Sequence, residues 1–176
     1  MATRDSILSI LLIAALLLAL PGAAQAAPLG DMVTLSIGDA RDGSSLAVGG
    51  RFGDWGLEAG AIPGDGRYPD ALDYPCPHDD YRVVDDDYVP GTYGFDTLRY
   101  FDLQPQLAVY LGAGLYFAEH QTMVQSRATG WIYENASTTE TDPAFSGGIV
   151  YRNDQVGIGL GYHSLRGANL QFLVNF

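Results

Sequence analysis

The sequence has no lysine and a single cysteine, Cys76. All nine basic residues are arginines, set against 21 acidic residues, which gives a net charge of −12. A chain this acidic is not expected to bind nucleic acid or another anionic surface by bulk electrostatic attraction. One cysteine cannot form an internal disulfide, so no cystine framework holds the fold.

The chain also lacks an apolar run long enough to cross a membrane as a helix. Residues 7–20 are almost uniformly apolar, but a spanning helix needs about 20 such residues. The small residues that follow end in an Ala-x-Ala site at positions 24–26, as secretory signal peptides do. We therefore expect residues 1–26 to be a cleaved signal peptide and residues 27–176 to form one exported domain.

Sustained apolar spacing at three and four residues, which would indicate a helix, is missing from residues 27–176. Apolar residues instead take every second position, as in residues 33–37, 107–117 and 170–176, which predicts strands with one apolar face. We count eight strands, with three tight turns at one end and longer connections, including residues 62–92 and 119–143, at the other. This layout predicts an all-β fold, an eight-stranded antiparallel up-and-down transmembrane β-barrel with both termini at the end of the tight turns.

Turn residues predict how the strands pair. Gly53-Asp54 suits a two-residue type II′ turn, with glycine first, that places Phe52 opposite Trp55 on the apolar face. Three further connections are expected: Asn153-Asp154, which pairs Arg152 with Gln155; residues 165–167, which pair Tyr162 with Leu170 and His163 with Asn169; and residues 103–106, which place Leu98 and Tyr100 on the apolar face and Arg99 on the other.

The two faces of these strands differ in size as well as polarity. One face carries bulky apolar residues, and the other carries many glycines with a few charged residues. A soluble barrel would have to expose the glycine-rich face to water, whereas a membrane barrel turns its bulky face to lipid. The interior would then hold a network of mutually neutralising charges, formed by Arg51, Glu58, Arg99 and Arg152. Aromatic residues near strand ends are expected to form interfacial girdles: Trp55, Tyr93, Phe117, Trp131, Tyr151 and Phe176.

The final strand, Leu170-Gln171-Phe172-Leu173-Val174-Asn175-Phe176, resembles the last strand of the small outer-membrane barrels typified by the OmpA transmembrane domain, OmpX and OmpW. The glycine-rich segment 106–116 is similar to the fifth strand common in that superfamily. The resemblance implies residence in the outer membrane, contact with its lipid and lipopolysaccharide, and a monomer. It also implies that Leu170, Phe172, Val174 and Phe176 form the signal read by the barrel-assembly machinery.

His163 and Ser164 invite comparison with outer-membrane lipid A deacylases, which use a His and a Ser close together on a barrel strand. Adjacent residues of a strand point to opposite faces, so an inward His163 leaves Ser164 outward. A general base must lie within hydrogen-bond reach of its nucleophile. We therefore expect His163 to be a structural residue that contacts Asn169 across the hairpin, and catalysis by His163 is the weaker alternative.

The acidic segment 70–87 holds five closely spaced candidates for a Ca²⁺ or Mg²⁺ site: Asp79, Asp80, Asp85, Asp86 and Asp87. Their spacing matches no EF-hand loop, and a solvated acidic loop is the favoured interpretation. Cys76 and His78 could bind a softer metal only with further ligands, and there is no second cysteine. No other cofactor is expected.

These patterns favour a non-enzymatic outer-membrane protein whose barrel is a scaffold and whose acidic external loops contact ions, lipopolysaccharide or a partner. Two alternatives stay open, a lipid A-modifying enzyme that uses His163 and a narrow gated channel through the barrel. For the orientation, we expect Asp80 and Thr138 outside the cell and Asp54, Gln104 and Asp154 in the periplasm.

Overall fold

The computed structural model describes residues 31–41, 43–153 and 155–175. These residues form nine β-strands, β1 (Met32–Ala40), β2 (Gly43–Phe52), β3 (Trp55–Pro63), β4 (Tyr81–Tyr88), β5 (Gly91–Gln104), β6 (Leu107–Ser126), β7 (Ile132–Arg152), β8 (Val156–His163) and β9 (Gly167–Asn175). Among them there is no helix long and apolar enough to span a bilayer. The predicted signal peptide, residues 1–26, and Phe176 lie outside the described residues.

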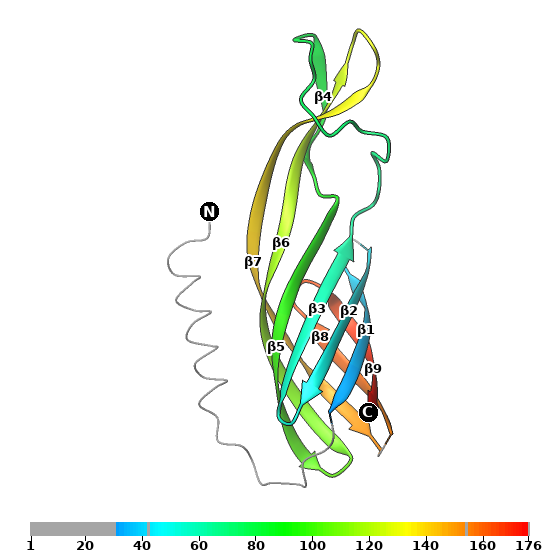
Figure 1. The fold of residues 1–176 in the computed structure, drawn as a ribbon, viewed down its shortest axis with the longest axis vertical. Helices are drawn as coiled ribbons and strands as arrows, with labels where there is room; N and C mark the ends of the chain where they lie inside the picture. Colours follow the sequence, from blue (N-terminus) through cyan, green and yellow to red (C-terminus); the bar gives the residue numbers. More distant parts are fainter. Residues whose placement is uncertain (1–30, 42, 154, 176) are drawn as a thin grey trace.

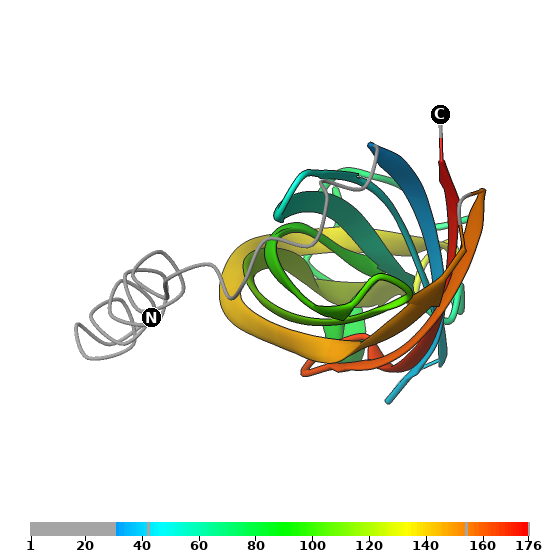
Figure 2. The same ribbon diagram turned by 90° about the horizontal axis from the view of Figure 1, so that it is seen from below.

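Eight of the strands close into an antiparallel barrel, as the sequence predicts (Figures 1 and 2). The barrel closes where β1 pairs with β9, from Met32 opposite Asn175 to Asp39 opposite Ala168. Moving from Val109 on β6 to its paired residue on the next strand, and so on around the barrel, leads back to β6 at Phe117. One circuit therefore shifts the position along β6 by eight residues. A barrel of eight strands has an interior just wide enough to be filled by its own side chains.

The alternation of each strand separates the two faces of the barrel wall. All eight barrel strands turn large apolar side chains outward, where they are exposed, including Val33, Leu46, Leu57, Phe95, Leu111, Ile149, Leu160 and Phe172. We call this surface the apolar belt. Small and polar residues face inward, and some inward glycines give space to larger neighbours. A Cβ atom on Gly60 would lie 2.5 Å from the Tyr116 hydroxyl and 2.9 Å from the Arg166 side chain.

The tight turn between β2 and β3 is the predicted one. Phe52 pairs with Trp55, and Gly53 has a φ of 60° while no non-glycine residue in the described part of the chain has a positive φ, which is the pattern of a type II′ turn. Two other predicted registers are wrong by two residues, since Arg152 pairs with Gly157 and Tyr162 pairs with Ala168. A shift of two residues keeps every side chain on its predicted face.

The predicted faces of β5 are wrong near the tight turn. A β-bulge between Asp102 and Gln104 adds a residue to this strand, and one extra residue exchanges the faces of all that precede it. Leu98 and Tyr100 are therefore buried inside the barrel, and Arg99 lies on the outer wall. There its guanidinium packs over the Trp55 ring at 4.8 Å and pairs with Asp54 at 3.1 Å.

Beyond the barrel, β6 and β7 continue as a long hairpin that reaches the far end of the molecule (Figure 1). The segment 119–143, predicted as a long connection, is therefore mostly strand. β4 pairs with the far part of β6, and Leu72 forms a parallel bridge to Tyr133 on the other side of the hairpin. We call the sheet formed by β4 and the far halves of β6 and β7 the protruding sheet.

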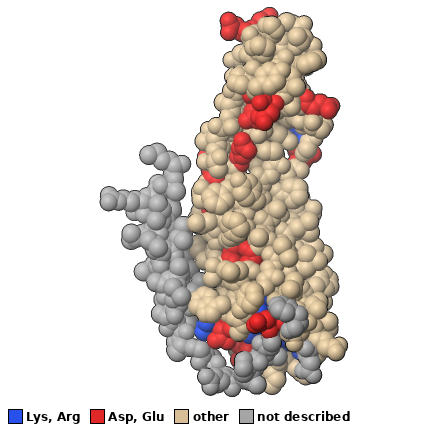
Figure 3. Space-filling view, viewed as in Figure 1, with Lys and Arg blue, Asp and Glu red and all other residues tan. Residues whose placement is uncertain are grey.

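The residues expected on opposite sides of the membrane lie at opposite ends of the barrel. Asp54 and Gln104 lie at the end where Met32 and Asn175 pair, and Asp80 and Thr138 lie toward the other end. Asp154 is outside the described residues. In one space-filling view, acidic side chains gather on the protruding part and at the base, while most of the wall between them carries none (Figure 3).

Candidate functional site

The charged residues inside the barrel form two separate clusters. The cluster near the tight turns, here the lower cluster, consists of two arginines around one carboxylate. Arg51 reaches Asp102 at 3.0 Å, and Arg152 reaches the same carboxylate at 2.8 Å. Arg51 also donates to the Gly53 carbonyl at 2.7 Å and stacks over the Tyr100 ring at 4.5 Å. Because both guanidiniums are buried, Asp102 is what allows two like charges to lie side by side.

The upper cluster lies toward the other end and centres on Arg166, which comes from the turn between β8 and β9. Its guanidinium contacts Glu58 and lies 3.3 Å from Asp96. Asp96 also accepts a hydrogen bond of 2.7 Å from the Tyr116 hydroxyl and lies 3.1 Å from Nε2 of His163. Two buried carboxylates therefore share one arginine, one hydroxyl and one imidazole.

The contacts of His163 assign its tautomer. Its Nδ1 accepts hydrogen bonds from the backbone N–H groups of Leu165 and Arg166, at 3.1 and 3.0 Å. An imidazole nitrogen that accepts carries no proton, so the proton is on Nε2, which donates to Asp96. The ring is thus neutral, and Arg166 is the one cation of the upper cluster among the described residues. The partner of His163 is Asp96 rather than the predicted Asn169.

Ser164 is not arranged to serve as a nucleophile for His163. Its hydroxyl accepts a hydrogen bond from the Phe145 backbone N–H at 3.0 Å, on the exposed side of the wall. His163 has no exposed surface and points to the opposite side. The two side chains therefore lie on different faces, as the alternation predicts.

Apolar residues fill the barrel between the two clusters. The buried side chains that pack there come from five different strands: Met32, Leu98, Tyr100, Tyr110, Val150 and Leu173. Tyr100 and Tyr110 pack with ring centroids 5.7 Å apart. This layer joins side chains of β1 and β9 to those of β5, β6 and β7 on the other side of the barrel, and it fills the lumen between the two ends.

The predicted interior network contains some of the correct residues but not their grouping. Arg51 and Arg152 meet in the lower cluster, and Glu58 lies in the upper one. Arg99 belongs to neither, because of the bulge in β5. Sequence reasoning missed Asp96, Asp102 and Arg166. A signal was present for the first two, since they are the two acidic residues of a predicted strand in which most other side chains are uncharged.

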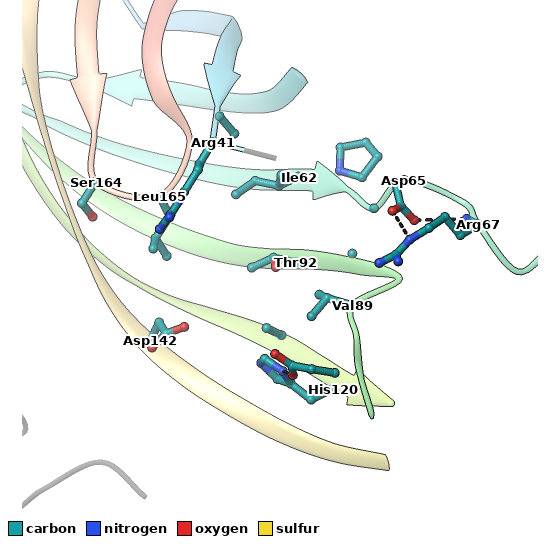
Figure 4. Close-up of a pocket in the computed structure, with 16 residues that line it drawn as sticks. Arg41, Ile62, Asp65, Arg67, Val89, Thr92, His120, Asp142, Ser164 and Leu165 are labelled. Atoms are coloured by element: carbon teal, nitrogen blue, oxygen red, sulfur yellow. Dashed lines mark hydrogen bonds and ion pairs between the residues drawn. The ribbon is translucent and has the colours of Figure 1, made fainter. Parts of the chain in front are cut away.

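A cavity of about 720 Å³ opens at the mouth of the barrel opposite the tight turns (Figure 4). Its walls come from the β1–β2 turn with Arg41, the loop after β3 with Asp65 and Arg67, and the β8–β9 turn with Leu165. His120 on β6 and Asp142 on β7 line another side. The residue after Leu165 is Arg166, so the cavity meets the upper cluster at this turn. The mouth is a polar vestibule above a closed interior.

The acidic residues of segment 70–87 are spread over β4 and the loop before it rather than gathered at one point. Asp85 pairs with Arg67 at 3.0 Å, Asp87 contacts His120, and Asp80 lies 3.6 Å from Arg127. Within the described residues there is no group of three His, Cys, Asp or Glu side chains placed to hold a metal ion. Cys76 is a free, partly exposed thiol.

Several predicted aromatic and assembly residues lie on the apolar belt. Tyr93 and Phe117 pack together at a centroid distance of 5.9 Å on the outer wall, and Phe172 and Val174 are exposed on β9. Trp131 is different from the prediction, because the hairpin of β6 and β7 carries it far beyond the belt. It cannot form part of an interfacial girdle with Tyr93.

No protein-family model matches this chain, and no curated protein matches it. A de novo designed transmembrane β-barrel has a TM-score of 0.50 and 12% identity, over 87% of this chain and all of the design. Neisserial surface protein A has a TM-score of 0.42 and 15% identity, over 83% of this chain and 94% of its own. Ail, the attachment invasion locus protein of Yersinia pestis, solved with the heparin analogue sucrose octasulfate, has a TM-score of 0.40 and 14% identity, over 83% of this chain and 95% of its own.

The likeness to the designed barrel shows the fold. The chain is a closed eight-stranded antiparallel transmembrane β-barrel. This is the architecture that the resemblance to the OmpA and OmpX superfamily predicted.

Proposed function

We propose that this protein is a non-enzymatic outer-membrane β-barrel that anchors an acidic protruding sheet at the cell surface and serves in interaction with a partner. The observation that carries the proposal is the length of β6 and β7. On the outer wall of β6 the apolar residues end at Phe117 and are followed by Glu119 and Gln121. The strand then runs to Ser126, about 30 Å beyond Phe117 at strand rise.

The apolar belt supports residence in a membrane. Exposed Leu, Ile, Val and Phe side chains surround all eight barrel strands, and such a surface is stable in lipid but not in water. Lipid and lipopolysaccharide of the outer membrane are the partners we propose for this belt. The outward residues of β9, Leu170, Phe172 and Val174, support a role for this strand in recognition by the barrel-assembly machinery. We propose a monomer that binds no nucleic acid.

The closed interior favours a scaffold over a channel. A solute would have to pass the upper cluster, the layer of Tyr100 and Tyr110, and the lower cluster in turn. Each cluster is held by charge-assisted hydrogen bonds that are costly to break once buried. The hidden position of His163 likewise favours a protein without hydrolytic activity.

Heat-modifiable gel mobility, measured after cell fractionation, tests the proposal. A membrane barrel stays folded in cold detergent and migrates differently after boiling. We expect the protein in the outer-membrane fraction with such a mobility shift, and no conductance above background in planar bilayers. Recovery in the soluble periplasmic fraction would contradict the membrane assignment, and steady unitary conductance would contradict the closed scaffold.

A further inference from the structure

The far end of the protruding sheet presents one face whose residues are aligned across three strands. Tyr81 on β4 pairs with Ser126 on β6, and the Ser126 N–H donates to the Trp131 carbonyl at 3.0 Å. In the next row, Val83 pairs with Val124, which pairs with Tyr133. Paired residues share a face, and so do residues two apart on a strand. The two rows therefore lie on the same side of the sheet.

The centre of this face is covered and its rim is exposed. Tyr133 and Val124 are buried, and the Tyr74 ring packs against Tyr133 at 5.6 Å. The exposed side chains around them are Trp131 (60%), Val83 (56%), Tyr74 (50%) and Tyr81 (36%). We call these four residues the tip patch.

The tip patch is separate from the membrane surface. Among the described residues, the other exposed large apolar side chains belong to the apolar belt, except Leu103 at the opposite end of the barrel. Ser126, which lies between Tyr81 and Trp131, is about 30 Å along β6 from Phe117. Lipid around the barrel therefore does not cover these side chains. Exposed aromatic residues gathered in this way are typical of protein interfaces.

The surroundings of the tip patch are acidic. The segment 70–87 supplies Asp73, Asp79, Asp80, Asp85 and Asp86. Nearby arginines offset only part of this charge. Arg67 pairs with Asp85 at 3.0 Å, and Arg127 lies near Asp80. Arg82 lies on the opposite face, where it donates to the Gln125 side-chain oxygen at 2.7 Å. A positively charged ligand would relieve this crowding of like charges.

We propose that the tip patch is the docking surface for a cationic amphipathic segment of a partner protein. Its apolar side chains would pack on Trp131 and Tyr81, and its lysines or arginines would face the surrounding carboxylates. Charge complementarity selects this occupant over a second copy of the chain, which carries the same net negative charge. The inference rests on the proposed function, because it requires that this end of the barrel face a partner.

A binding experiment on the purified protein, in nanodiscs of zwitterionic phosphatidylcholine, tests the proposal. The probe is a fluorescently labelled 18-residue amphipathic peptide of leucine and lysine, followed by polarisation against empty nanodiscs. We expect saturable binding that weakens as salt is raised, and that falls at least about tenfold in the double variant Tyr81→Ala and Trp131→Ala. The same peptide with glutamate in place of lysine should not bind.

Two further variants keep the test specific. Arg82→Ala changes the same strand at the same height on the opposite face, and we expect it to bind the peptide at least as well as the parent protein. The double variant Tyr81→Phe and Trp131→Phe keeps the aromatic surface and should retain most of the affinity. Heat-modifiable mobility confirms that each variant is folded.

Three results would overturn the proposal: equal binding by the alanine variant, equal binding to empty nanodiscs, and self-association through the tip patch without peptide binding. The last would assign the surface to a second copy of the chain. The purified protein can bind the peptide whichever way it is inserted in the nanodisc. A failure of the binding test therefore contradicts the docking proposal alone, and the surface display of Thr138 is tested separately by labelling on cells.

Discussion

The Arg166 guanidinium contacts the Glu58 carboxylate inside the barrel although 108 residues separate them in the chain. The two side chains are 3% and 1% exposed. The contact joins the turn between β8 and β9 to the middle of β3, across the lumen. It closes the upper cluster and, with the apolar layer beneath it, makes the barrel a solid support for the protruding sheet.

Replacing Arg166 by Met should destabilise the folded barrel by about 3–5 kcal/mol, because it leaves Glu58 and Asp96 buried without a cation. Denaturant unfolding in detergent or lipid measures the loss. Adding Glu58→Gln should recover a substantial part of it. Arg41→Ala, at an exposed arginine on another turn of the same end, is the control and should cost less than about 0.5 kcal/mol. Similar losses in both single variants would show that the upper cluster does not stabilise the barrel.

Asp102 pairs with arginines inside the barrel, and Asp54 pairs with an arginine on the outer wall. Substitutions of these two carboxylates should therefore lower the free energy of unfolding by very different amounts. Asp102→Asn leaves Arg51 and Arg152 side by side with no carboxylate, and we expect a loss of about 3–5 kcal/mol. Asp54→Asn affects a pair with Arg99 on the outer wall, in which the Asp54 side chain is 54% exposed, and such a pair is worth about 0–1 kcal/mol. Unfolding midpoints of the two variants compare them directly. A larger loss for Asp54→Asn would place Arg99 inside the barrel after all.

Gly167 and Gly53 both have positive φ angles, of 72° and 60°, but their surroundings differ. A Cβ atom on Gly167 would collide with the Asp39 carbonyl oxygen, whereas on Gly53 it would meet nothing within 4 Å. Gly53→Ala should therefore cost about 1 kcal/mol from backbone strain alone, and Gly167→Ala distinctly more. Thermal unfolding, read by gel mobility, gives both values. Equal shifts would mean that β1 does not pack against the β8–β9 turn.

Deletion of Phe176 separates assembly from stability. If the final strand carries the signal read during insertion, the deletion should lower the amount of protein in the outer membrane. The fraction that does insert should melt almost normally, because a closed barrel has all its strand edges paired. Immunoblots of membrane fractions and heat-modifiability curves measure the two effects. Normal insertion with a large loss of thermal stability would instead make Phe176 a packing residue.

Much of the barrel could be predicted from the sequence because the membrane enforces a strict period of two on its walls. The Phe52 and Trp55 pairing followed from a glycine in the one position that a type II′ turn reserves for it. The registers of the other two hairpins were wrong by two residues, because a shift of that size leaves the alternation unchanged and nothing in the pattern penalises it.

The faces of β5 could not be predicted because both sides of its lower half contain large apolar residues. Leu98 and Tyr100 alternate with Arg99 and Phe101, so only the bulge at Asp102 decides which pair faces lipid. The protruding sheet was missed for a related reason. Its strands lie in water, where threonines and aspartates leave no apolar alternation to detect.

Arg166 was missed because it lies in a turn, where an arginine is usually solvated. Its burial depends on Gly60 and on contacts with Glu58 and Asp96, which come from strands far away in the chain. Short-range patterns carry no information on such a contact.

Labelling of single cysteines on intact cells tests the central claim most directly. Cys76 is first replaced by Ser, and Thr138 on β7 and Asp54 in the β2–β3 turn are then changed to Cys one at a time. An impermeant thiol reagent added to whole cells should label the Thr138 position strongly, and the Asp54 position only after the outer membrane is broken. Labelling of Asp54 but not of Thr138 on intact cells would place the protruding sheet in the periplasm and contradict the account.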